Sequence, residues 1–242
     1  MDKTRTRVSL TLAYVGALAA AASAETITLR SGQVGGNPGS PTQFDDIMTF
    51  GPTVTTGPLS ANPFTAADFN ATTANPAMLI NPYTSWLPAL TYDPQARWVG
   101  TGLYIFDDLG APSSTLYRVP FNVTTASITS ASISIAWSAD DSLGDLLYGG
   151  ANPIGAYLRD GSGNVTPLNP VAGGGFTFES TVLNYNITGA LTTGANELFL
   201  YQRDQGLGIA GLIFGAEIRV VPAPSALALA GLPALALTRR RR

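Results

Sequence analysis

Apolar and polar residues alternate in short runs through the middle of the chain. In residues 132–137, Ser-Ile-Ser-Ile-Ala-Trp, a large apolar side chain occupies every second position, which is the spacing of a strand with one face in a core and the other in water. Similar runs, rich in β-branched and aromatic residues, recur between clusters of Gly, Pro, Asn and Asp. We therefore predict strands at residues 26–30, 102–106, 116–123, 131–137, 156–159, 176–182, 185–187, 197–202 and 212–220.

Turn sequences separate these predicted strands at regular intervals. Residues 160–164, Asp-Gly-Ser-Gly-Asn, form a hairpin loop in this interpretation, and residues 194–196, Gly-Ala-Asn, form another turn. Regular short strands of this kind predict an all-β fold, a single β-sandwich or jelly-roll domain over residues 25–219. Residues 25–81 are rich in Gly and Pro and contain one obvious strand, so we expect mainly loops there, which wrap or feed the sandwich.

The first 24 residues have the three parts of a secretory signal peptide. A basic start precedes a mostly apolar stretch at residues 8–22, and small residues follow at the expected cleavage site, Ala22 and Ala24. We expect the Sec translocon to export the chain and signal peptidase to cut it, so that the mature protein begins at Glu25. The alternative is an N-terminal membrane anchor that is never cut.

Residues 220–242 combine a proline motif, an apolar Ala/Leu stretch and a basic end. This order resembles the PEP-CTERM sorting tail, in which a Val-Pro-Glu-Pro-Ser type motif precedes a hydrophobic helix and a basic cluster. Ala223 stands where that family usually has Glu. The motif is Val221, Pro222, Ala223, Pro224 and Ser225, and the basic cluster is Arg239, Arg240, Arg241 and Arg242.

The resemblance implies how the protein is exported and where it is finally located. The apolar stretch would enter the inner membrane transiently as a helix, the arginines would stay cytoplasmic, and a membrane enzyme of the exosortase type would process the tail. The protein would then reach the cell surface or the extracellular matrix. A permanent single-pass anchor and an ordinary buried helix are the alternatives for this segment.

The amino-acid composition excludes most kinds of catalytic site. The chain has no Cys and no His, which excludes thiol nucleophiles, Cys-ligated zinc and a Ser-His-Asp triad. Between Glu25 and Val221 it carries fifteen acidic residues and six arginines, a balance of −9 that the formal net charge of −3 conceals. Such a surface repels phosphate backbones, so we expect no nucleic-acid partner. No cofactor is expected, apart from the calcium ion considered below.

A second resemblance concerns the body of the chain. From Trp86 onward, the order of motifs is similar to jelly-roll domains of the galactose-binding-like type, which implies that fold. The resemblance rests on the segments Asp93–Gly100, Tyr117–Phe121, Ala136–Asp141 and Gly194–Leu198.

Two kinds of site are candidates within the body. Asp140, Asp141 and Asp145 form a dense carboxylate group that would suit a structural Ca²⁺ ion, although turns recruit Asp without any metal. Aromatic side chains could stack on a sugar ring at a loop end, or else belong to the core, which is our expectation for Trp137. The candidate sugar-binding residues are Trp86, Trp98 and Tyr148.

These features predict an exported surface or matrix protein without catalytic residues, with a scaffold or adhesion role in exopolysaccharide or biofilm. Extracellular polysaccharide is the expected partner. The first alternative is a carbohydrate-binding module, which an exposed aromatic and a polar loop cluster at one end of the sandwich would distinguish. The second is a carboxylate-dependent glycoside hydrolase, for which Glu179, Glu197 and Glu217 are candidates.

Overall fold

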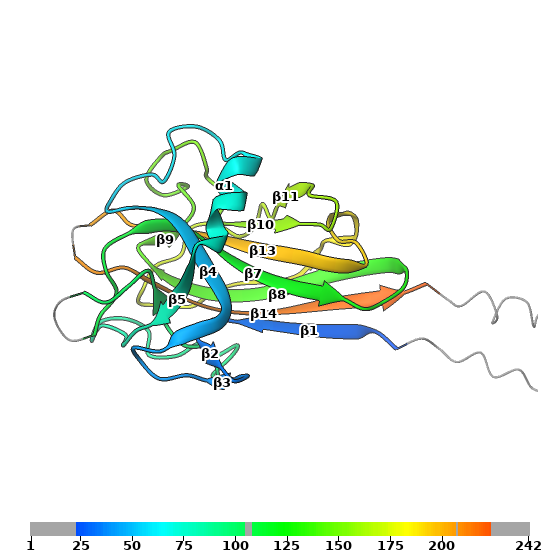
Figure 1. Ribbon diagram of the computed structural model, residues 1–242, viewed down its shortest axis with the longest axis horizontal. Coiled ribbons are helices and arrows are strands. Elements are labelled where there is room, and N and C mark those ends of the chain that lie inside the picture. The colour runs from blue at the N-terminus through cyan, green and yellow to red at the C-terminus, as the bar shows by residue number, and fades with distance from the viewer. Residues whose placement is uncertain (1–22, 105–107, 207, 224–242) are drawn as a thin grey trace, which may run out of the picture. The chain divides into compact units, whose positions relative to one another are not determined.

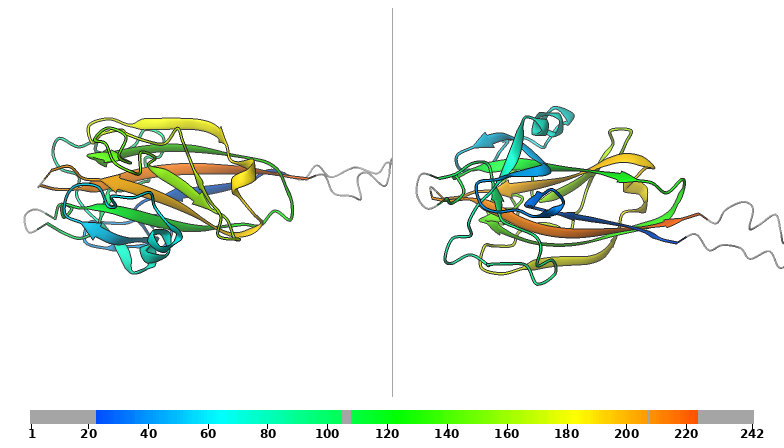
Figure 2. Two further views of the ribbon diagram at one scale, coloured as in Figure 1. Left: turned by 90° about the horizontal axis from the view of Figure 1, so that it is seen from above. Right: turned by 60° about the horizontal axis from the view of Figure 1, so that its bottom comes forward.

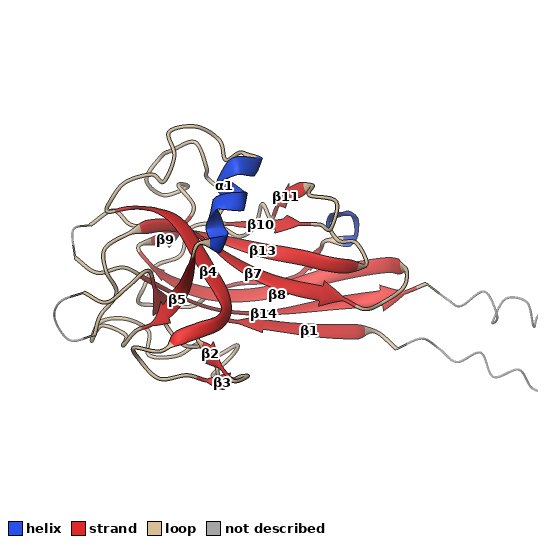
Figure 3. Ribbon diagram, in the orientation of Figure 1, coloured by secondary structure: helices blue, strands red, loops and turns tan. Residues whose placement is uncertain are grey.

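The computed structural model describes residues 23–104, 108–206 and 208–223 (Figure 1). Residues Ala24–Pro222 form one compact unit. Strands and loops make up nearly all of this unit (Figure 3), and an antiparallel sheet curls so that two layers face each other (Figure 2). The fold is therefore all-β, with the layered arrangement of a β-sandwich, as the alternating pattern predicts.

The first layer is built around one long strand, β14, which has a neighbour on each side. β14 pairs along its whole length with β8, and the N-terminal strand β1 pairs with its other edge. A short strand, β6, pairs with β14 at Leu212, outside the part of β14 that pairs with β1. β12 pairs with the edge of β8 that does not pair with β14. The strands of this layer are β1 (Glu25–Arg30), β6 (Val99–Gly100), β8 (Ile128–Asp140), β12 (Ser180–Asn186) and β14 (Gly211–Pro222).

The second layer is centred on β13 and β7, which pair in antiparallel register from Gly194 opposite Val123 to Gln202 opposite Thr115. β5 pairs with β6 and so joins the two layers along one side. The strands of this layer are β4 (Phe44–Val54), β5 (Asn75–Leu79), β7 (Ser114–Val123), β9 (Ser142–Leu143), β10 (Ala156–Arg159), β11 (Val165–Pro167) and β13 (Gly194–Arg203).

The inward faces of both layers form the main core. Ile133, Ile135 and Trp137 from β8 pack in one cluster with Leu198 and Leu200 from β13. Because successive side chains point to opposite faces of a strand, each of these strands gives one face to this cluster, and Phe199 and Tyr201 on the other face of β13 belong to a separate cluster. The prediction that Trp137 belongs to the core is confirmed, since it is 2 % exposed.

Residues 31–80 contribute more regular structure than we expected. They supply the strands β4 and β5, the small hairpin of β2 (Gln33–Val34) and β3 (Asn37–Pro38), the helix α1 (Ala66–Asn70) and the 3-10 turn η1 (Ala71–Thr73). Phe64 and Phe69 from this segment pack edge-on against Tyr157 of β10, in a cluster with Phe199 and Tyr201 of β13. The segment therefore covers the outer face of the second layer.

Several strand boundaries differ from the predicted ones. The predicted strand 102–106 is not present in the described residues, where Leu103 makes a single bridge to Gly110. The predicted strands 176–182 and 185–187 are one strand, β12, with an irregularity between Val182 and Tyr185. β14 continues to Pro222, so Val220–Pro222 belong to the sheet rather than to a separate tail from residue 220.

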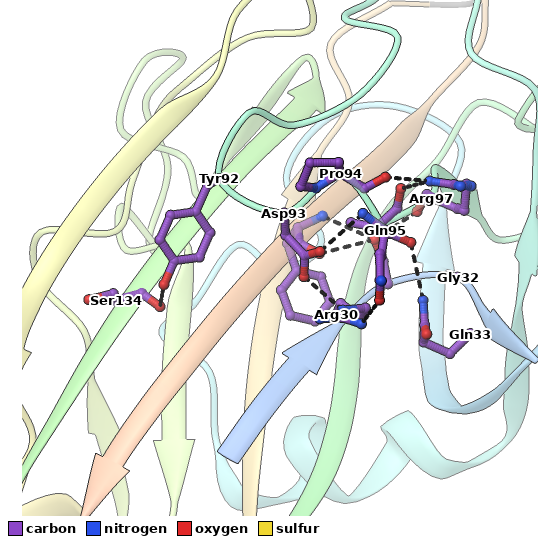
Figure 4. A network of polar contacts seen from close by, with 12 residues as sticks. Arg30, Gly32, Gln33, Tyr92, Asp93, Pro94, Gln95, Arg97 and Ser134 are labelled. Atoms are coloured by element: carbon purple, nitrogen blue, oxygen red, sulfur yellow. Dashed lines mark hydrogen bonds and ion pairs between the residues drawn. The ribbon is translucent and has the colours of Figure 1, made fainter. Parts of the chain in front are cut away.

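A polar network clamps the long loop of residues 81–98 onto the first layer (Figure 4). Arg30 Nε donates to Asp93 Oδ2 at 2.7 Å, and a second guanidinium nitrogen of Arg30 donates to Gln95. Asp93 Oδ1 accepts from the Gln95 amide. A Cβ at Gly215 of β14 would come within 2.5 Å of the Asp93 Cβ, so only glycine lets the loop approach the strand this closely.

Both termini of the compact unit lie at one end of the first layer. Glu25 stands opposite Val220, so β1 begins beside the end of β14 (Figure 1). The Glu25 carboxylate accepts hydrogen bonds from the backbone amides of Thr124 and Thr125, which fixes the start of β1. At the other end of the layer, Asp140 pairs with Gly211.

Within the described residues no helix is both long enough and apolar enough to cross a membrane. The predicted membrane helix, Pro224, Ser225 and the arginines 239–242 lie outside the described residues, as does Ala22 of the cleavage site.

Candidate ligand-binding pocket

A pocket of about 240 Å³ opens at the end of the unit that carries Asp140, opposite the termini. Three separate segments build it: the clamped loop 81–98, the end of β8, and the loop that leads from β13 to β14. Phe176 adds a wall from a fourth segment. The lining residues are Tyr83, Ser85, Trp86, Asp140, Asp141, Phe176, Asp204, Gly206, Gly208 and Ile209.

Three carboxylates gather in this pocket. Asp140 Oδ2 accepts a hydrogen bond from Trp86 Nε1 at 3.0 Å, and Asp141 Oδ2 accepts from the Gln205 amide at 2.7 Å. Asp204 Oδ1 accepts from the Gly206 amide at 3.1 Å. Asp204 Oδ2 is buried and has no hydrogen-bond partner. The cluster therefore holds an acceptor that the protein leaves unsatisfied, and such atoms are uncommon in folded proteins.

Burial and repulsion from neighbouring carboxylates disfavour the charged forms of Asp140 and Asp204. Burial is the main cause that raises the pKa of Asp140 well above its usual range, and the adjacent carboxyl of Asp141 adds to it. Burial also raises the pKa of Asp204 to about 6, where the charge of Asp141 acts in the same direction and the Gly206 amide acts against it. A cation or hydrogen-bond donor placed among these groups would relieve both effects.

A buried ion pair supports the pocket from beneath. Arg203 Nε lies 3.1 Å from Asp145 Oδ1, a distance that permits ion pairing, although Nε is not aligned to donate a hydrogen bond. Asp145 also accepts from the Tyr201 hydroxyl and from the Asn152 amide. Asp145 is 1 % exposed. Its carboxylate therefore lies inside the protein and does not line the pocket.

Aromatic side chains flank the carboxylates. Tyr83 lines the pocket and is 45 % exposed, and Tyr148 is 39 % exposed. Tyr148 does not belong to the lining, but partial burial and the charges of Asp141 and Asp140 raise the pKa of its phenol. The Arg203 guanidinium lies 5.8 Å from the centre of the Tyr148 ring. The pocket thus combines acceptors with aromatic rings that are open to solvent.

The predicted sugar-binding residues are therefore divided between surface and core. Tyr148 is exposed beside the pocket. Trp86 lines the pocket but is 4 % exposed, and its ring packs on Trp98 with 4.4 Å between the ring centres. Trp98 lies in the core, where its Nε1 donates to the Leu87 carbonyl at 2.7 Å. Only Tyr148 of the three offers a broad exposed ring.

The predicted calcium ligands are not brought together as a set of three. Asp140 and Asp141 line the pocket, whereas Asp145 points inward to Arg203 and Tyr201. Among the described residues, no group of three or more His, Cys, Asp or Glu side chains is arranged to hold a metal ion.

The three candidate glutamates lie outside the pocket. Glu197 is held between Arg118 and Arg159; burial raises its pKa, but the hydrogen bonds from both arginines outweigh burial and lower it. Glu179 accepts from the amides of Thr91 and Tyr92, and Glu217 lies on β14 opposite Ser134. The arginines around Glu197 line an open hollow of about 450 Å³ on the second layer.

Sequence reasoning missed Asp204 and Tyr83. Asp204 is a single acid in a Gly-rich loop, and Tyr83 belongs to a segment rich in Pro and Asn. Neither has a neighbour in the sequence that marks a site. A search for exposed aromatics in the loops between predicted strands would have found Tyr83, but only the fold places it beside Asp140 and Asp204.

Comparisons of the chain with protein-family models, with curated proteins and with solved structures find no match.

Proposed function

We propose that this protein is an exported, non-catalytic surface or matrix protein whose β-sandwich binds a saccharide in the pocket formed by Tyr83, Asp140 and Asp204. One observation carries the proposal: exposed tyrosines and a polar cluster occur together at one end of the sandwich, opposite both termini. This is the feature that distinguishes a carbohydrate-binding module from a plain scaffold. An attached tail would leave the pocket accessible.

The chemistry of the pocket suits a sugar. Aromatic rings offer an apolar face for the C–H face of a sugar ring, and carboxylates accept hydrogen bonds from hydroxyl groups. The volume of about 240 Å³ is below the roughly 300–1,000 Å³ of pockets for drug-sized ligands. We therefore expect one sugar ring of a chain to enter the pocket while its neighbours remain outside.

The contacts of the other acids support a binding role over hydrolysis. Glu197 is neutralised by two arginines, and Glu179 accepts hydrogen bonds from backbone amides of the clamped loop. Both contacts hold secondary structure together. Export and processing of the tail by an exosortase-type enzyme belong to the same proposal, and they rest on the signal peptide and the proline motif. A jelly-roll of the galactose-binding-like type is its finer fold assignment.

A glycan array followed by calorimetry on residues 24–222 tests the binding function, because these residues form a compact unit. We expect selective binding of a saccharide. Tyr83→Ala should raise the Kd by about 3- to 10-fold through loss of ring contact, and Tyr148→Ala tests whether the ligand extends beyond the lining to this ring. Phe44→Ala is the matched control, since Phe44 is 52 % exposed and does not line the pocket. No binding to any glycan, or an equal loss in the Phe44 variant, would refute the proposal.

A further inference from the structure

All charged side chains that line the pocket carry the same sign. The charged residues of the lining are Asp140, Asp141 and Asp204, and the lining contains no arginine or lysine. Asp204 is 1 % exposed, and its Oδ2 atom lacks a hydrogen-bond partner. A neutral sugar hydroxyl could satisfy one such acceptor, but it would leave the negative charge of the cluster uncompensated.

The nearest cation is engaged elsewhere. Arg203 Nη1 donates to the backbone carbonyl of Asp204 at 2.8 Å, and Arg203 Nε lies against Asp145 Oδ1. The guanidinium also lies over the Tyr148 ring. Arg203 therefore supports the wall of the pocket. Burial and the charge of Asp141 outweigh its positive charge and leave the pKa of Asp204 raised, and among the described residues no arginine or lysine belongs to the lining itself.

Resting on the saccharide-binding function proposed above, we infer that the pocket selects an amino sugar with a free primary ammonium group. The ammonium would lie among Asp140, Asp141 and Asp204, and the sugar ring would lie against the exposed face of Tyr83.

The three N–H donors of a primary ammonium suit a pocket that is lined by several carboxylate acceptors. Its positive charge offsets the carboxylate repulsion, which neutral hydroxyl and N-acetyl groups cannot do. An N-acetyl group is also larger, in a pocket that accommodates about one sugar ring. The same ammonium chemistry occurs on a lysine side chain, which lacks the ring, so a test must separate the charge from the sugar.

Calorimetry at pH 7 with four probes makes that separation on residues 24–222. The probes are a glucosamine trimer, an N-acetylglucosamine trimer, a glucose trimer and free lysine. We expect the glucosamine trimer to bind at least tenfold more tightly than each of the other three. Equal binding of the N-acetylated trimer would overturn the selectivity and leave saccharide binding intact. Equal binding of lysine would overturn the role of the ring. No binding of any sugar would refute the proposed function itself.

Charge-neutral variants locate the ammonium. Asp204→Asn and Asp141→Asn keep the side-chain shape and should each reduce the preference for glucosamine over N-acetylglucosamine by about tenfold. The control is Glu217→Gln. Glu217 lies on β14 opposite Ser134, which is six residues before Asp140 on β8, so this substitution removes one negative charge outside the pocket lining. An unchanged preference in both aspartate variants, with thermal unfolding showing them folded, would overturn the assignment, as would an equal loss in the Glu217 variant.

Proton release gives a second readout that a purely structural role would not produce. The titratable and charged groups around the cluster are Asp140, Asp141, Asp204, Tyr83, Tyr148 and Arg203. Near pH 6 Asp204 is partly protonated, so an ammonium that binds there should release protons to the buffer. Titrations in two buffers of different ionisation enthalpy measure this release. Equal heats in the two buffers would contradict ammonium binding at Asp204.

Discussion

Asp204 shows how a single side chain can oppose the stability of its own fold. Its carboxylate is almost completely buried, one oxygen has no partner, and the pKa of the group is raised to about 6. In the unfolded chain the same group would titrate near 3.8. Between these values the folded protein binds more protons than the unfolded one, so stability falls as the pH rises. The raised pKa of Asp140 acts in the same direction.

Asp204→Asn should therefore stabilise the unit at neutral pH. We expect its thermal midpoint at pH 7.5 to exceed that of the wild type by roughly 2–4 °C, the shift that about 1 kcal/mol produces in a domain of this size. The expected shift of the thermal midpoint is smaller than the raised pKa alone would produce, because solvent screens part of the charge of Asp204. The difference should shrink as the pH falls and vanish only well below 3.8, where Asp204 is protonated in both the folded and the unfolded chain. Thermal unfolding followed by circular dichroism from about pH 2.5 to 8 measures it, and a constant difference would contradict the assignment.

At the scale of elements, the loop 81–98 depends on contacts with strands that lie far away in the sequence. Arg30 of β1 binds Asp93 (Figure 4), and the glycine at position 215 of β14 leaves room for Asp93 to approach the strand. Trp86 of the same loop packs against Gly211, where a Cβ would come within 2.8 Å of the indole ring. The loop is thus fixed to one layer at two points, and Tyr83 of this loop lines the pocket.

Breaking the clamp should affect stability and binding together. Asp93→Ala removes the partner of Arg30 Nε and of the Gln95 amide, and we expect it to lower the free energy of unfolding by about 1–3 kcal/mol. The Kd for the bound saccharide should rise, because Tyr83 loses its support. Arg219→Ala is the control, an exposed residue on β14, and it should change stability by less than about 0.5 kcal/mol. Urea denaturation and calorimetry measure both effects; a fully stable Asp93 variant would contradict the clamp.

The sequence pattern predicts the strands that are rich in β-branched and aromatic residues. It predicts β8, β10, β13 and β14 to within three residues at each end. Apolar residues alternate in β8, whereas residues 198–201 of β13 are a continuous apolar run that is buried on both faces. The pattern misses β4, where the buried Asp45 interrupts it; this carboxylate accepts from the backbone amides of residues 32, 33, 47 and 48. The pocket is missed in part for a different reason. Its residues come from segments that are distant in sequence, so no motif within one segment indicates that they meet in the fold.

At the scale of the whole unit, the proposed processing positions near Glu25 and Pro222 lie at the end opposite the pocket. Val220, Val221 and Pro222 are paired with β8, so the first residues of the proline motif are part of the sheet. A protease that needs an unpaired substrate would not find it in these three residues. The proposed N-terminal cleavage would occur beside them, since Glu25 begins the neighbouring strand.

The intact mass of the protein recovered from its source cells tests this arrangement. We expect a chain that begins at Glu25 and ends at Pro222 or a few residues later, because cleavage before Pro222 would remove paired residues of β14. A start at Met1 would contradict removal of the signal peptide. A chain that still carries residues 239–242 would contradict processing of the tail.

The position of β14 between β1 and β8 also determines how the unit would respond to tension. A pull on the chain at residue 222, with a ligand held at the pocket, would run parallel to the strands. The ladder hydrogen bonds on both sides of β14 would then be loaded in shear, all at once, whereas a sideways pull would open them one after another. A tether attached at this point would therefore load the sheet in shear.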